Sequence, residues 1–237
     1  MFEIIEGFTF AGKSTMEQGF RLVGRDAPTP SEKEIVESVP FAQGVYDFSA
    51  IMGDRVYENR TITYQFLLLE SDYPHRKVAE IQMKNWLMTP AIQPLYDTHD
   101  YGYHWLGKFT SVNVDDSHHD GTLVVSAEFS AYPFMIADLP EGNDVWDTFN
   151  FELDVAQTVD YTVNGSKTIT LYNLGGRSIA PKITASSKMS IIMGGTTYSV
   201  PAGESKSETF RLAVGANMLT INGTGTIKFE FHKELMA

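Results

Sequence analysis

One segment with helical character, preceded by a long strand, limits the folds open to this chain of 237 residues. From Arg60 onward, apolar Ile62, Tyr64 and Phe66 alternate with polar residues, which is the period of a half-buried strand. Residues 66–69 form an unbroken apolar run, which predicts burial on both faces at the end of the strand. Because convincing helix signals occur only after this strand, we expect a mainly β protein with one α-helix.

The helix signals follow the strand directly. Ser71 and Asp72 are residue types that cap a first turn, and Pro74 is tolerated there because first-turn N–H groups have no helical acceptor. Thr89-Pro90 ends the helix, since a residue before proline is disfavoured in the α region. We therefore predict a helix between these two signals.

Two apolar stripes run along the predicted helix. The first consists of Ala79, Met83, Trp86 and Leu87, and the second of Val78, Ile81 and Met88. A helix that covers one sheet needs a single stripe, so the second stripe needs another surface to cover it. Two alternatives remain open: a long loop of the same chain, or a neighbouring subunit.

The composition excludes several classes of site. The chain has no cysteine, so it has neither disulfides nor thiolate metal ligands. We find no signal-peptide pattern at the N-terminus and no apolar run of the ~20 residues that a membrane helix needs, so we expect synthesis in the cytoplasm and no membrane partner. The net charge of −12 fits simple solubility, and it also fits a surface that repels DNA.

The remainder of the chain divides near residue 140. Residues 26–40 are charged and bounded by prolines, which predicts an exposed arm or loop. Residues 108–115 and 122–132 alternate around Asp120-Gly121, a strong β-hairpin signal. Residues 141–237 show short strands separated by turns such as Asn164-Gly165 and Asn222-Gly223, which predicts a small β-sandwich.

Two motifs resemble a phosphate-binding loop and a metal site, but the residues around them do not fit the structures that such sites require. Residues 7–14 match GxxxxGK[ST], but a phosphate loop must open a helix, and the residues after Lys13 are glycine-rich and strand-like, so we expect a hairpin turn. His118 and His119 lie among aspartates, but adjacent strand residues point in opposite directions, so we expect a solvated turn and no metal site. We predict no catalytic residue and no cofactor.

The order of several loose motifs resembles the distal tail proteins (Dit) of bacteriophages with long, non-contractile tails. These motifs span nearly the whole chain: Phe8-Thr9-Phe10 with Gly12-Lys13-Ser14, Gly19-Phe20, Arg60-x-Ile62, Asn85-Trp86-Leu87, Leu95-Tyr96-Asp97, Tyr103–Gly107-Lys108, Leu171-Tyr172-Asn173-x-Gly175, Pro181-x-Ile183 and Gly215-x-Asn217 through Gly223.

The resemblance implies a structural hub in the virion, at the tip of the phage tail. Residues 1–140 would form the ring, usually a hexamer, and residues 141–237 a galectin-like β-sandwich that projects outward. The ring would join the major tail tube protein to the tail-associated or tail-fibre protein and let DNA pass without specific binding, and the sandwich would hold peripheral baseplate or receptor-binding parts. In such a ring, Val78, Ile81 and Met88 are our candidates for the subunit contact.

Two other functions compete with the hub. The C-terminal sandwich could be a lectin for host cell-wall sugars that stacks them on Tyr161, Tyr172 and Tyr198, although three tyrosines are few for such a pocket. An enzyme that hydrolyses nucleotides would act through Lys13. A ring in solution favours the hub, and a monomer favours either of the others.

Overall fold

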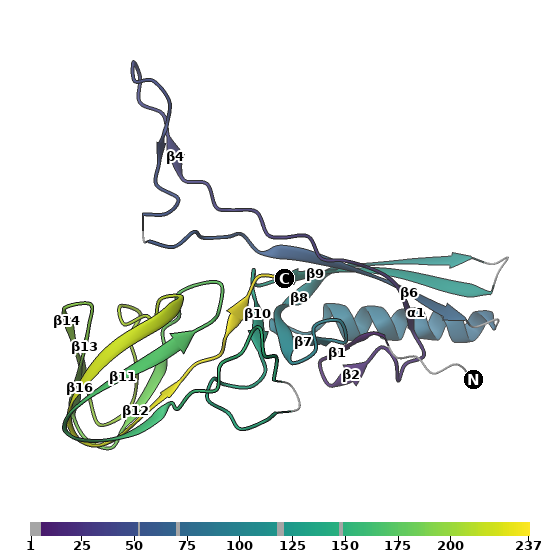
Figure 1. The fold of residues 1–237 in the computed structure, drawn as a ribbon. Helices are drawn as coiled ribbons and strands as arrows, with labels where there is room; N and C mark the ends of the chain where they lie inside the picture. Colours follow the sequence, from purple (N-terminus) through teal and green to yellow (C-terminus); the bar gives the residue numbers. More distant parts are fainter. Residues whose placement is uncertain (1–5, 52, 70–71, 118–120, 147–148) are drawn as a thin grey trace. The chain divides into compact units, whose positions relative to one another are not determined.

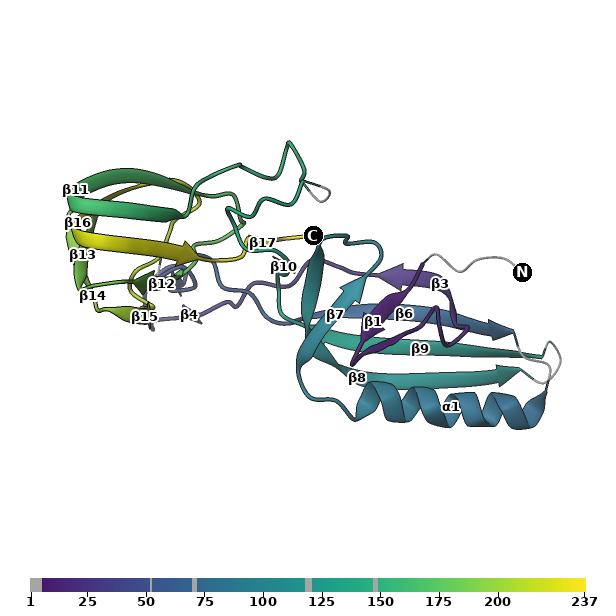
Figure 2. The ribbon, with the colours of Figure 1, turned by 90° about the horizontal axis from the view of Figure 1, so that it is seen from below.

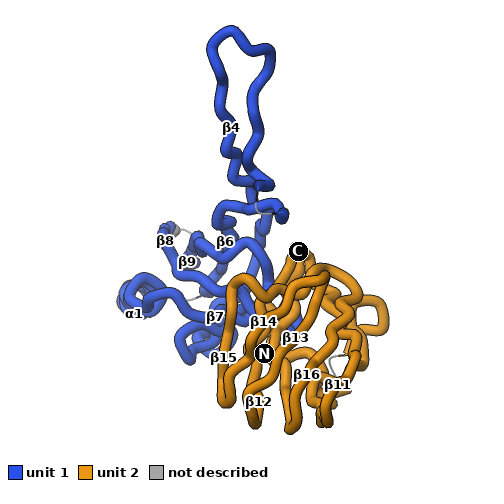
Figure 3. The backbone as a smooth tube through the Cα atoms, turned by 90° about the vertical axis from the view of Figure 1, so that its left-hand side faces the viewer, with its two compact units in different colours: residues 1–135, 236–237 blue, residues 136–235 orange. Residues whose placement is uncertain are grey.

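The structure is a computed structural model that describes residues 6–51, 53–69, 72–117, 121–146 and 149–237. This part of the chain contains seventeen strands and one helix, which confirms the mainly β prediction (Figure 1). The chain forms two compact units, coloured separately in Figure 3. Unit 1 holds residues 1–135 with 236–237, and unit 2 holds residues 136–235.

Unit 1 is built on one sheet in the order β2-β1-β7-β8-β9-β6-β3 (Figure 2). Its elements are β1 (Phe8–Phe10), β2 (Lys13–Ser14), β3 (Arg21–Asp26), β6 (Arg60–Leu69), α1 (Tyr73–Met88), β7 (Gln93–Asp97), β8 (Tyr103–Ser117) and β9 (Thr122–Ala131). Successive strands pair antiparallel throughout.

The central pair, β6 and β9, follows the alternation of the sequence. Ile62, Tyr64 and Phe66 have no exposed surface and pack in the core of unit 1. The prediction of burial on both faces at the end of β6 was wrong, because Leu69 is 70% exposed. Leu69 shares its face of the strand with exposed Thr61 and Gln65, which no layer of the described chain buries, so an apolar run alone did not establish two-sided burial.

The β8–β9 hairpin has the predicted pairing, with Ser117 opposite Thr122. The predicted turn residue Asp120, with His118 and His119, lies outside the described residues. Strand β8 is long enough to pair with several strands: residues 105–107 pair with β7, and residues 107–117 pair with β9. It changes partner at Gly107, which lies opposite both Gln93 and Ala131.

An arm formed by residues 27–59 connects the end of β3 to the start of β6. It contains two short paired strands, β4 (Val36–Glu37) and β5 (Tyr46–Asp47), and a bridge between Glu32 and Tyr57. In Figures 1 and 3 the arm extends away from the sheet of unit 1. Residues 26–40 are thus only the first half of a longer hairpin.

Unit 2 is organised around two long strands. Its elements are β11 (Asp160–Asn173), β12 (Lys182–Ala185), β13 (Met189–Met193), β14 (Thr196–Val200), β15 (Gly203–Lys206), β16 (Gly215–Glu230) and β17 (Glu234–Leu235), and β17 pairs with β10 (Met135–Ala137). β11 pairs along its whole length with residues 215–228 of β16, while the other side of β16 pairs first with β13 and then with β12.

The predicted turns at Asn164-Gly165 and Asn222-Gly223 were wrong. Both dipeptides lie inside long strands, with Gly165 opposite Gly223. Gly223 and Gly225 have φ angles of 148° and 138°, which glycine adopts readily and other residues do not. The glycines therefore mark where the β11–β16 ribbon bends around the core instead of where strands end.

Candidate subunit interface

Helix α1 has one face against its own sheet and another without cover in this chain. Asp72 caps the helix by accepting a hydrogen bond from the His75 N–H, and Pro74 lies in the first turn, as predicted. The other predicted cap, Ser71, lies outside the described residues. Of the first stripe, Met83, Trp86 and Leu87 are buried and Ala79 packs against the core.

Polar contacts fix this helix at both ends. The Trp86 Nε1–H donates to the Phe10 carbonyl oxygen at 2.8 Å, which ties the C-terminal half of α1 to β1. Near the other end, buried Arg76 donates from Nε to Asp116 Oδ1 on β8 at 2.7 Å. The hydrogen bond from Arg76 is the main reason that the pKa of Asp116 lies below its usual value. The rotation of α1 about its axis is therefore set, and so is the side that faces outward.

The outward side carries the second stripe. Val78, Ile81 and Met88 are 52%, 59% and 46% exposed. Nothing in the described part of this chain covers them, so the first alternative, a loop of the same chain, does not apply to the described residues. They stay our candidates for a contact with another subunit.

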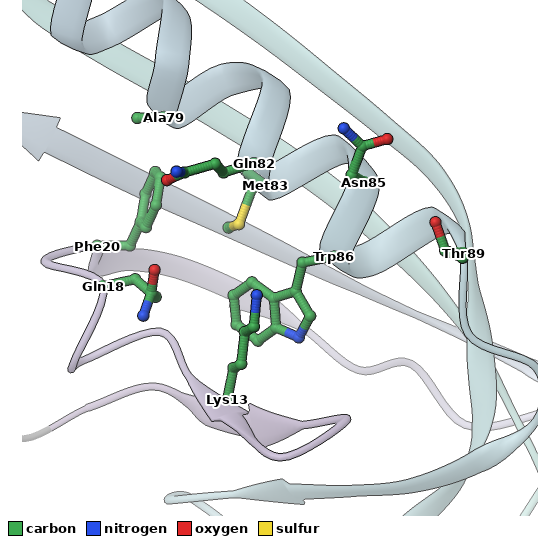
Figure 4. Close-up of a pocket in the computed structure, with 9 residues that line it drawn as sticks. All are labelled: Lys13, Gln18, Phe20, Ala79, Gln82, Met83, Asn85, Trp86 and Thr89. Carbon is green, nitrogen blue, oxygen red and sulfur yellow. The ribbon is translucent and has the colours of Figure 1, made fainter.

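A hollow of about 420 Å³ opens beside the second stripe, between α1 and the β1–β2 hairpin (Figure 4). Its apolar wall consists of Phe20, Ala79, Met83 and Trp86. Its polar groups are the amides of Gln18, Gln82 and Asn85, the hydroxyl of Thr89 and the amine of Lys13. This lining offers hydrogen bonds and one positive charge over an aromatic floor.

The arm carries the largest set of uncovered apolar side chains in unit 1. Its exposed members are Ile35, Val36, Val39, Phe41, Val45, Tyr46, Phe48, Ile51 and Val56. An isolated two-stranded ribbon is marginally stable in water, and apolar patches of this kind mark contact sites. Sequence reasoning missed this surface because it assigned only residues 26–40 to an exposed arm or loop.

Two arginines fix the base of the arm. Arg25 donates from Nε to Asp97 Oδ2 at 2.7 Å and also pairs with Asp100. Arg60 donates to the Ala27 carbonyl oxygen at 2.5 Å, and its guanidinium lies 4.6 Å from the centre of the Trp105 ring. The strands at the two ends of the arm, β3 and β6, are thereby linked by side chains to β7 and β8.

Asp97 is the centre of this network. The Tyr64 hydroxyl donates to Asp97 Oδ2 at 2.7 Å, and the His99 backbone N–H donates to Oδ1 at 2.9 Å. Burial raises the pKa of Asp97, but the hydrogen bonds from His99 and Tyr64 and the charge of Arg25 outweigh it, so the pKa lies below its usual value. Burial is also the main cause that raises the pKa of Tyr64, so its hydroxyl keeps the proton that it donates.

The described part of the structure gives no support to the phosphate-binding loop or the metal site that the two sequence motifs resemble. The GxxxxGK[ST] residues form the tight β1–β2 hairpin: Ala11 and Gly12, with φ angles of 50° and 72°, make its turn, and Lys13 lies on a strand. In the described residues, no three histidine or carboxylate side chains gather as a metal site requires. No helix in this described part is long and apolar enough to cross a membrane.

The three tyrosines considered for sugar stacking do not form a platform. The rings of Tyr161 and Tyr198 pack edge-on against the core residues Phe229 and Phe210. Tyr172 is 40% exposed and lies at the other end of β11 from Tyr161. The geometry gives the lectin alternative no support.

Comparison with solved structures identifies the fold. The Dit protein (gp 19.1) of phage SPP1, described as a paradigm of the hub adsorption apparatus in phages that infect Gram-positive bacteria, aligns with a TM-score of 0.68 at 11% identity. The alignment covers 96% of this chain and 99% of that chain. This chain has the Dit fold. The resemblance to distal tail proteins is confirmed at the level of the fold, although no family model and no curated protein matches the sequence.

Two other solved structures are more distant. Structures of the phage P2 baseplate in its activated conformation, with Ca and with Sr, align at TM-scores of 0.42 and 0.41 and identities of 9% and 8%. Each alignment covers 98% of this chain and 99% of the other. At TM-scores below 0.5 they carry no argument, so the assignment of the Dit fold depends on the SPP1 protein.

Proposed function

We propose that this protein is a structural, non-enzymatic hub at the tip of a phage tail, and that its copies form a closed ring through unit 1. The uncovered apolar surface of α1 and the arm carries the proposal. This chain buries the aromatic residues of its core but leaves this apolar surface exposed, so a neighbouring copy can cover it.

The two apolar surfaces suit a ring. The stripe on α1 and the arm are different surfaces of one unit, so a head-to-tail contact between them can repeat from copy to copy, and it forms a ring when the rotation between copies closes. Covering the exposed half of each stripe residue contributes about 1 kcal/mol per side chain. The hollow beside α1 lies next to the stripe and falls within the same proposed contact surface.

The ring would connect the tail to its tip. By analogy with the Dit fold, we propose a hexamer that joins the major tail tube protein to a tail-associated or tail-fibre protein, with unit 2 as a galectin-like sandwich that holds receptor-binding parts. The proposed location is the virion tail tip, after synthesis in the host cytoplasm. DNA would pass through the ring without specific binding, which the net charge of −12 favours.

Charging the stripe tests the ring. In Ile81→Asp, closing the contact would bury an unpaired carboxylate, so we expect folded monomers where the wild type forms rings. Light scattering after size-exclusion chromatography gives the mass. Val214→Asp in unit 2 is the matched control, because Val214 is 58% exposed and Ile81 59%. A wild-type chain that stays monomeric at high concentration, or an Ile81→Asp ring of unchanged mass, would contradict the proposal.

A further inference from the structure

The outer edge of β11 is open along much of its length. In the described structure, β11 pairs with β16 on one side and with no strand on the other. In an antiparallel pair, the N–H and C=O of one residue point to the same side, and successive residues alternate. The N–H and C=O of Tyr172 both contact the side-chain amide of Gln157, outside the sheet. The even-numbered residues of β11 therefore direct their backbone groups outward.

The two ends of this edge are already occupied. At one end, the Gln157 amide donates to the Tyr172 carbonyl oxygen at 2.8 Å and accepts from the Tyr172 N–H at 2.9 Å, as a neighbouring strand would. At the other end, Lys167 Nζ donates to the Thr162 carbonyl oxygen at 3.3 Å. The outward groups between them belong to residues 164, 166, 168 and 170.

The other long or exposed sheet edges carry features that discourage pairing. The edge strand β3 has a bulge between Leu22 and Gly24. β15 carries Glu204 and Lys206, and β14 has five residues and is followed directly by Pro201. Bulges, charges, proline and short length are the usual protections of sheet edges. β11 has fourteen residues, no proline and, between Tyr161 and Asn173, only one charged residue.

The sheet face beside this edge is uncharged. Its outward side chains on β11, β16 and β13 are Thr168, Thr170, Tyr172, Ala216, Met218, Thr220, Ser190 and Ile192. Met218 at its centre is 69% exposed, and Thr168 shares a hydrogen bond with Thr220 across the strands at 3.1 Å. A strand added at the edge would extend this hydroxyl-rich and apolar face without burying a charge.

We propose that the outer edge of β11, over residues 164–170, binds an extended β-strand of a partner protein, with uncharged and β-branched side chains. Strand addition of this kind takes its affinity from backbone hydrogen bonds and its selectivity from alternate side chains. A second copy of this chain fits less well, because antiparallel pairing of two such segments places Lys167 opposite the other copy's Lys167, and like charges opposite each other are destabilising. This site lies on unit 2 and does not depend on ring formation by unit 1.

A synthetic strand tests the site. We expect the labelled peptide Lys-Thr-Val-Thr-Val-Thr-Val-Lys to bind the full-length protein and to protect the amides of Thr168 and Thr170 from hydrogen exchange. Thr170→Pro removes an outward N–H and leaves the ladder to β16 intact, so it weakens binding by roughly tenfold or more. Thr170→Val is the matched control, because it keeps the N–H and the β-branched shape, and we expect wild-type affinity.

Each result of this experiment either supports or overturns strand addition at β11. Circular dichroism and thermal unfolding check that Thr170→Pro is folded. If Thr170→Pro is not folded, Thr168→Lys is used in its place, because it keeps every backbone N–H and adds a charge beside the edge. The same peptide with a central proline should not bind. Unprotected Thr168 and Thr170 amides at saturating peptide, or equal affinity of Thr170→Pro and Thr170→Val, overturn the proposal. Association of two copies that Thr170→Pro abolishes overturns it in favour of self-pairing.

Discussion

At the scale of single residues, the buried carboxylate of Asp97 is the most consequential polar group. It has no exposed side-chain surface and serves Arg25, Tyr64 and His99 together. The sequence motif Leu95-Tyr96-Asp97 supported the Dit resemblance, but it said nothing of this role. Nothing local shows that an arginine 72 positions earlier will meet Asp97. Such long-range pairs need the sheet order, which periodicity does not give.

Replacing this carboxylate tests the network. Asp97→Asn leaves the guanidinium of Arg25 without its main partner, and we expect the free energy of unfolding to fall by roughly 3 kcal/mol at neutral pH. Because the folded-state pKa of Asp97 is lowered, its contribution is complete above the unfolded pKa of about 3.9 and is lost as the pH falls through the folded value. Urea unfolding of both proteins should therefore show a stability difference that shrinks below about pH 4. A difference that stays constant down to acid pH would contradict this account.

At the scale of elements, Gly107 is the residue of β8 that lies between two strands, opposite Gln93 of β7 and Ala131 of β9. A Cβ added at Gly107 would lie 2.1 Å from the Ser130 carbonyl oxygen and 2.9 Å from the Ala131 Cα. Both neighbours are backbone atoms of the paired strand β9, so they cannot move without breaking the ladder. Only glycine lets the two strands approach this closely.

This close approach predicts a large effect of one methyl group. Gly107→Ala should lower the free energy of unfolding by about 3 kcal/mol, at the upper end of overpacking effects. Gly24→Ala is the matched control in the same sheet, because its Cβ would meet the Gln65 side-chain oxygen at 3.1 Å, and an exposed side chain can shift. Thermal or urea unfolding measures both. Equal losses in the two variants would show that strand propensity, not the close contact, sets the cost.

Local chemistry determined which elements could be predicted. The helix was found because capping, proline placement and the Met83–Trp86–Leu87 stripe all act within a few residues. The same local reasoning failed at Asn164-Gly165, where a glycine bends a strand that continues. It also missed the full length of the arm. Turn signals identify where the backbone can bend, but only the pairing partner shows whether the strand ends there.

At the scale of the whole molecule, the sequence indicated the second helix stripe but not what covers it. A stripe is a local property of one helix, whereas a subunit contact is a property of several copies. Val78, Ile81 and Met88 are exposed in the single chain, as are the apolar residues of the arm. The ring thus stays a prediction, and the most direct test is to shorten the arm while the rest of the fold is kept.

Shortening the arm should abolish the ring and leave the fold intact. The Phe48 N–H donates to the Ile35 carbonyl oxygen at 2.8 Å, so a two-residue Asn-Gly turn can replace residues 36–47 and close the remaining ladder. The deleted segment includes exposed Phe41 and Tyr46 and no residue of the unit 1 core, so we expect the thermal midpoint to change by only a few degrees.

Mass measurement then decides between two roles for the arm. If its apolar side chains are covered by a neighbouring copy, the shortened chain is a monomer, as Ile81→Asp is expected to be. If rings with the wild-type number of copies persist, the stripe on α1 is sufficient for assembly, and the arm faces a different protein of the tail. Unfolding of the shortened chain would contradict both readings, because it would make the arm part of the fold of unit 1.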